Sequence, residues 1–347
     1  MINIPPGTRH NILLALCCLP AIMLILALGF YFNRQPQATL MASGALSLSF
    51  GANKTWKGST FVVLMATAFG LSIAAILGSL AGNSHMLYMA GAVLLTGFYI
   101  VISDINSSVG WIFLQSSIAF LVAGFFPGSL QQAADRAALM GIGSVLQIFS
   151  LGLFFQGLRF NRHELSSFKS LRFPKQLSLL NQHRIHLKWS ITFGVIAMGL
   201  TIFIDRTISI QHSYWAEMTL LICLRNDYHE SLLRVPARIM GTFIGGLAAG
   251  ALSTYWQQPI IIVVAFLASA LIAISMSYSL TPKVYAIFTF FITMMIIFML
   301  SSISIAQGNI AEQRMEATLL GGIMALASVV LTKLVTYQHI NQARQNT

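Results

Sequence analysis

Long apolar segments recur along almost the whole chain and restrict its fold more than any other feature. A helix needs on the order of 20 residues to cross about 30 Å of hydrocarbon, and ten segments of this chain are long and apolar enough to do so. Only 8% of the residues are charged and 56% are hydrophobic, whereas an ordinary soluble domain has roughly 25% charged residues. The apolar runs are also too continuous for a β-barrel, whose strands alternate polar and apolar residues. The sequence therefore predicts an all-α membrane protein.

Two shorter segments, residues 39–50 and 214–224, are marginal as spans, and the positive charges indicate how to count them. Lys and Arg concentrate in the cytoplasmic loops of membrane proteins. If both segments cross, twelve spans place 16 of the 20 Lys and Arg residues on the side of the two termini; if neither crosses, the better orientation divides them 11 to 9. We therefore predict about twelve transmembrane helices with both termini cytoplasmic. The net charge of +11 indicates loop bias, not affinity for nucleic acid.

The chain also repeats itself. The sequence A-T-A-F-G of Ala66–Gly70 matches G-T-F-I-G of Gly241–Gly245 at an offset of 175 residues. Farther along, seven residues separate Arg136 from Gly143 and likewise Arg314 from Gly321, now at an offset of 178. Six spans per unit give both halves the same orientation, so we predict two parallel six-helix repeats related by an axis along the membrane normal.

This repeat predicts three parts of the chain. Residues 1–158 form the first repeat, 159–186 a basic linker and 187–347 the second repeat. The linker carries most of its charge as Lys and Arg, which favours a cytoplasmic segment beside anionic lipid headgroups. Two of its histidines, His183 and His186, can share a helix face, but two ligands alone make a weak metal site.

No motif for catalysis or for a cofactor is present. The chain lacks GxxxxGK[ST], GxSxG and HExxH, and its three cysteines all lie inside apolar segments. We therefore expect neither an enzyme nor an ATP-driven pump, and we assign no catalytic residue, no cofactor and no metal site.

Ionisable residues are distributed unequally between the two halves. The offset of 175 residues relates Glu217 to Ala42 and Arg238 to Val63. An ionisable group at helix depth costs at least about 2.5 to 3.5 kcal/mol, so it usually faces a partner or a water-filled path. The polar site is therefore predicted in the second half.

Arg238 has two interpretations. Pro236 is expected to begin its span, so Arg238 would lie in the first turn and could be an interface anchor paired with Asp227 or Glu230. Alternatively, Arg238 binds an anion at the head of a stripe with Thr242 and small residues that allow close helix packing.

Two ionisable residues, Glu217 and Arg314, lie outside this stripe, and the sequence predicts a role for each. Glu217 follows Tyr214 and Trp215 and is either part of an aromatic belt at the interface or a proton-coupling carboxylate. Arg314 is expected to pair with a loop residue such as Glu312.

Three elements of the second half carry a resemblance to a known family. They are W-x-x-x-T at Trp215 and Thr219, R-x-x-G-T-x-x-G at Arg238, Gly241, Thr242 and Gly245 followed by Gly246, and R-x-x-x-T-x-x-G at Arg314, Thr318 and Gly321. Together these resemble the fusaric acid resistance and aromatic acid exporter superfamily, and the pattern is also similar to plant aluminium-activated malate channels. The first half retains less of it, mainly Gly70, Thr67, Arg136 and Gly143.

The resemblance implies a bacterial inner-membrane efflux transporter. It would export small organic anions or aromatic and amphipathic weak acids, with proton coupling and with a periplasmic membrane-fusion adaptor as partner. The expected substrate or ion pathway comprises Arg238, Glu217, Trp215, Arg234, Thr242 and Arg314. The expected packing positions are Gly70, Gly241, Gly245, Gly246 and Gly321. A passive anion channel and a non-transporting envelope scaffold are the alternatives.

Overall fold

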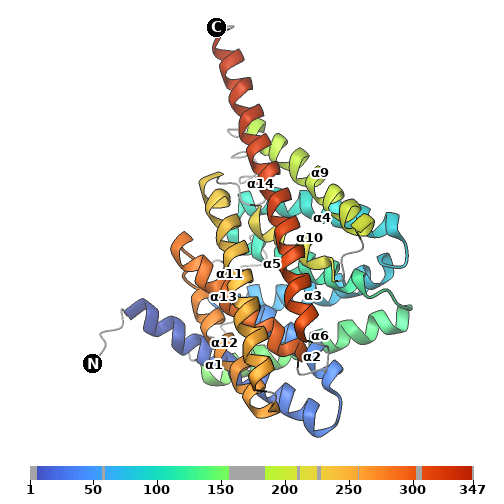
Figure 1. Cartoon of the computed structure of the whole chain (residues 1–347), viewed down its shortest axis with the longest axis vertical. Helices are drawn as coiled ribbons and strands as arrows, with labels where there is room; N and C mark the ends of the chain where they lie inside the picture. The colour runs from blue at the N-terminus through green and yellow to red at the C-terminus, as the bar shows by residue number, and fades with distance from the viewer. Residues whose placement is uncertain are drawn as a thin grey trace.

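The structure is a computed structural model, and it describes residues 6–56, 59–155, 184–208, 212–224, 228–256, 258–301 and 307–345. Twelve helices are formed by these residues, so the all-α prediction is confirmed. They are α1 (Pro6–Tyr31), α2 (Gln35–Ser49), α3 (Thr60–Ala81), α4 (His85–Ile105), α5 (Ser107–Phe125), α6 (Leu130–Phe154), α9 (Arg184–Ile208), α10 (Tyr214–Cys223), α11 (Tyr228–Tyr255), α12 (Pro259–Ser277), α13 (Pro282–Ser301) and α14 (Gln307–Gln345). Figure 1 shows them as one bundle, with the end of α14 extending beyond it.

Ten of these helices are long and apolar enough to cross a membrane. The chain is therefore a multi-pass membrane protein. The other two, α2 and α10, have 15 and 10 residues and correspond to the two marginal segments of the sequence. Whether they cross fully stays a prediction.

Packing is organised within each half and then between the halves. In the first half α2 packs on α6, α3 packs on α5 and α6, and α4 packs on α5. In the second half α10 packs on α14, α11 packs on α13 and α14, and α12 packs on α13. Between the halves, α1 lies against α12 and α4 lies against α9. Both halves contribute to one buried apolar core.

The predicted start of the helix that carries Arg238 is wrong. Pro236 lies inside α11, which begins at Tyr228. A proline has no N–H, so the carbonyl of Leu232 loses its usual helical partner, but such a loss is tolerated where neighbouring groups satisfy the backbone. The two additional turns place Glu230 and Arg234 on the same helix as Arg238.

The predicted linker, 159–186, falls mostly outside the described residues. Helix α9 already begins at Arg184, so the last three linker positions are helical. Asp227, a possible partner of Arg238, also lies outside the described residues.

Candidate functional site

Two arginines from neighbouring helices are buried close together. Arg238 of α11 is 2% exposed and Arg314 of α14 is 1% exposed, and their charges act on each other. In each of them, Nε and Nη1 find no hydrogen-bond partner among the described residues. A buried charge without a partner costs several kcal/mol, so this arrangement favours an anion between or beside the two guanidinium groups.

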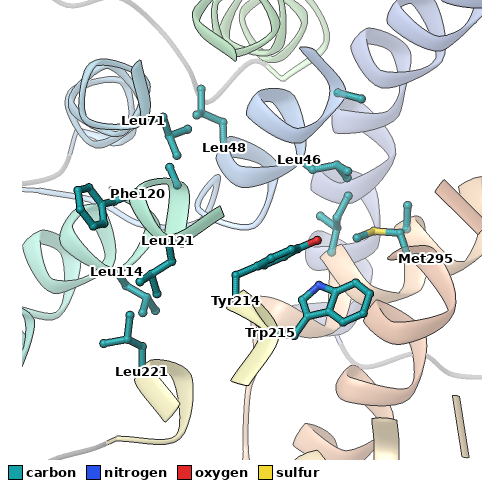
Figure 2. Close-up of a cluster of buried hydrophobic side chains, with 14 of the residues drawn as sticks. Leu46, Leu48, Leu71, Leu114, Phe120, Leu121, Tyr214, Trp215, Leu221 and Met295 are labelled. Carbon is teal, nitrogen blue, oxygen red and sulfur yellow. The ribbon is translucent and has the colours of Figure 1, made fainter. Parts of the chain in front are cut away.

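Trp215 provides the apolar wall of this site. The guanidinium of Arg314 lies 5.1 Å from the centre of the Trp215 ring, a cation–π contact. Trp215 is buried, and Figure 2 shows it beside Tyr214 on α10, with Leu121 of α5 and Met295 of α13 in the same cluster. The structure thus brings together three of the predicted pathway residues: Arg238, Arg314 and Trp215.

Glycines allow the helices of the site to approach one another. A Cβ at Gly321 would collide with the backbone carbonyl of Ala216, so α14 crosses α10 in direct contact. A Cβ at Gly241 would collide with the Thr289 hydroxyl, and one at Gly245 would lie 2.6 Å from the Phe290 carbonyl oxygen on α13. Gly246 is different, because a Cβ there would make only ordinary contacts with Ala311 and Met315.

Thr242 lies on the α13 side of α11. It is 1% exposed, and its hydroxyl accepts a hydrogen bond from the Thr293 hydroxyl at 3.5 Å. It therefore contributes to the α11–α13 contact, one turn beyond Arg238 on the same helix.

Arg234 has an environment of its own. Its Nε donates to Glu230 Oε1 at 2.8 Å and its Nη2 lies 2.5 Å from the same oxygen, while Tyr285 covers the guanidinium at 4.7 Å. The charge of Arg234 is therefore already compensated. Glu230, which was one possible partner of an interface-anchoring Arg238, is engaged by Arg234 instead.

Glu217 is buried on the opposite face of α10 from Trp215, since two residues differ by more than half a turn. It is 1% exposed and accepts a hydrogen bond from the Tyr88 hydroxyl of α4, in the first half. Asp205 and Arg206 of α9 act on it electrostatically. Glu217 thus belongs to a contact between the two halves and is separate from the arginine site.

The expected pairing of Arg314 with Glu312 is wrong. Glu312 and Glu316 are exposed, whereas Arg314 points into the core toward Trp215. A spacing of two residues places them on other faces of α14.

Sequence reasoning missed Tyr88 and Asp205. Asp205 is 2% exposed in the last turn of α9, and its Oδ1 has no partner among the described residues. Its place at the end of an apolar segment is a signal that could have identified it. Tyr88 gives no such signal, because its role depends on a contact 129 residues away in the chain.

Residues 196–328, less than half of the chain, match a family model described as fusaric acid resistance protein-like. The matched range contains α10, α11 and the buried arginines, and it confirms over these residues the resemblance predicted from the motifs. No curated protein and no solved structure matches the chain.

Proposed function

We propose that this chain, a multi-pass membrane protein whose second half is fusaric acid resistance protein-like, is an inner-membrane efflux transporter for small organic anions or aromatic and amphipathic weak acids. The observation that carries the proposal is the pair of buried arginines with unpartnered N–H groups. The family match favours transport over catalysis.

Arginine suits this task for two reasons. Its guanidinium stays charged at physiological pH, and its planar fork can donate two parallel hydrogen bonds to a carboxylate. Both arginines have unpartnered N–H donors and Arg314 lies beside the face of Trp215, so a weak acid can place its carboxylate at the arginines and its apolar part along the indole.

The proposed architecture is two parallel six-helix repeats. Its support is that equivalent helices pack in equivalent ways, as with α3 on α5 and α11 on α13. One glycine contact also corresponds: a Cβ at Gly143 would collide with the Met41 carbonyl, as one at Gly321 would with the Ala216 carbonyl. The offsets of 178 and 175 residues relate these two pairs.

The proposed topology has twelve crossings, both termini in the cytoplasm and a location in the bacterial inner membrane. It is supported by the 16 to 4 division of Lys and Arg residues that such an arrangement gives. A periplasmic adaptor is the proposed partner, because the turn between α3 and α4 and the one between α11 and α12 are too short to reach across a periplasm.

Glu217 is the proposed proton-coupling carboxylate. Its burial and its single hydrogen bond from Tyr88 place a titratable group between the two halves, where relative movement would change its surroundings. Its separation from Arg238 and Arg314 means that proton and anion occupy different sites.

The experiment that tests the proposal replaces Arg238 by Gln. Glutamine keeps a polar amide but is shorter and has no charge, so export of a weak acid from intact cells should be lost while the protein is made at the usual level. Export at the normal rate by a well-expressed Arg238→Gln variant would reject the arginine site.

A further inference from the structure

Four flat side chains form a column that leads from the surface of the molecule to Arg314. The ring of His212 lies 5.8 Å from that of Phe125 with planes 25° apart, and 5.2 Å from that of Trp215 with planes 20° apart. The guanidinium carbon of Arg314 in turn lies 5.1 Å from the centre of the Trp215 ring. His212 is therefore sandwiched between Phe125 and Trp215, directly before the arginine site.

His212 is held in a conformation that a histidine adopts at a cost. Its φ is +57°, in the left-handed region where residues other than glycine are uncommon and which often marks a functional position. A hydrogen bond of 2.8 Å joins its Nδ1 to Gln313 Oε1 on α14. Three ring contacts, with Phe125, Tyr214 and Trp215, and this hydrogen bond thus hold the side chain in place on a strained backbone.

The column also joins the two halves. Phe125 ends α5 of the first half, His212 precedes α10, and Arg314 lies on α14. His212 is partly exposed, whereas Trp215 and Arg314 are buried. From this partly exposed position the His212 ring stacks on the indole that faces Arg314.

We propose that His212 is the gate residue of the anion path at the end of the molecule where α10 begins. This inference rests on the proposed function, since it assigns a closing element to the site at Arg238 and Arg314. In the closed state the ring fills the space between Phe125 and Trp215. Opening breaks the ring contacts of His212 and its hydrogen bond to Gln313, and it releases the backbone strain at His212.

A reporter cysteine can measure whether this gate is closed. Thr318 is 2% exposed and lies one turn after Arg314 on α14, so we place the reporter there as Thr318→Cys. Cys17, Cys18 and Cys223 are replaced by serine in the same background. The readout is the rate of labelling by a membrane-impermeant thiol reagent added from the side of the α10 start.

His212→Gly is the decisive variant, because glycine accepts a positive φ without strain and the fold is preserved while the ring is lost. We expect labelling to become about tenfold faster, the factor that corresponds to about 1.4 kcal/mol. His212→Phe keeps a flat ring in the stack and should label nearly as slowly as the parent.

Phe126→Ala is the matched control. Phe126 neighbours the column and contacts Phe125 and Tyr214, but it does not contact the His212 ring. Its removal should leave labelling unchanged. The reporter's reactivity is checked in unfolded protein, so equal labelling rates in His212→Gly and the parent would overturn the gate. Because labelling does not depend on transport, loss of export in Arg238→Gln is scored separately.

Discussion

The two halves of the molecule differ at two arginines that the proposed repeat relates to each other. Arg136 of the first half donates from Nη1 to the Ser79 hydroxyl at 3.0 Å and to the Phe126 carbonyl. Arg314, 178 residues later, is 1% exposed, and its Nε and Nη1 have no partner among the described residues. Arg136 therefore joins a loop to a helix through its hydrogen bonds, whereas Arg314 has N–H donors without a partner among the described residues.

Helices α3 and α11 also differ in polarity, and α11 again carries the more polar side chains. In α3 the Thr67 hydroxyl donates to the carbonyl of Val63, and Val63 is an apolar core residue. The proposed repeat, at an offset of 175 residues, relates Val63 to Arg238 of α11, where the Thr242 hydroxyl accepts a hydrogen bond from Thr293 of α13. Similar helix packing therefore surrounds an apolar residue in one half and a buried arginine in the other, so the proposed function depends on a few side chains more than on the scaffold.

The largest expected effect is a difference in export between variants of Arg314 and of Arg136. Arg314→Gln removes a buried charge at the proposed anion site, and we expect export to fall by about a hundredfold, as when one member of a buried charge pair is removed. The variant without anion should be at least as stable as the parent, because an unpaired buried charge is no longer desolvated.

Arg136→Gln is the control for that prediction. It loses hydrogen bonds worth about 1 kcal/mol, so its thermal stability should fall while export continues. Export measured in cells and unfolding of the purified proteins give both quantities. Equal loss of export in the two variants would break the contrast between the halves.

A smaller effect is expected at the contact between the halves. Glu217→Gln keeps an acceptor for the Tyr88 hydroxyl but cannot bind and release a proton. Counterflow of a weak acid should continue, and its acceleration by a pH gradient should disappear. The companion variant Tyr88→Phe keeps the carboxyl and should retain a response to the gradient.

If the flux through the unmodified protein does not depend on the pH gradient, the result would favour a passive anion channel. In that case Glu217 would serve only to join α10 to α4.

The last comparison concerns three glycines, whose effects on stability should form a series. Gly245→Ala should lower the free energy of unfolding by about 1 to 3 kcal/mol, because the new methyl group meets the rigid backbone of Phe290. Gly70→Ala should cost less, since its neighbour is the Ser116 side chain, which can rotate. Gly246→Ala should be neutral or stabilising by up to about 1 kcal/mol, as helix propensity improves without a clash. Thermal unfolding in detergent measures all three, and equal losses would contradict the series.

Local sequence patterns predicted what depends on nearby residues. Helix length and composition predicted the all-α fold, and the small residues of α11 predicted close packing at Gly241 and Gly245. A site at Arg238 was predicted because an ionisable residue in an apolar helix requires a partner, and the structure buries this side chain.

Contacts between distant segments could not be predicted in this way. Arg314 was assigned to a loop contact because nothing in its own helix indicates Trp215, and the Tyr88 contact of Glu217 depends on how α4 meets α10. The continuation of α11 through Pro236 was missed because proline normally begins or ends a helix in water.

Binding of an anion by the purified protein tests the central claim most directly. Thermal unfolding is followed in acetate, malonate and benzoate, for the parent and for the double variant Arg238→Gln/Arg314→Gln. A ligand present at about 100 times its Kd adds about 2.7 kcal/mol to stability. We predict that at least one of these carboxylates stabilises the parent and that the double variant does not respond. An equal response of both proteins, or none in the parent, would contradict the arginine site.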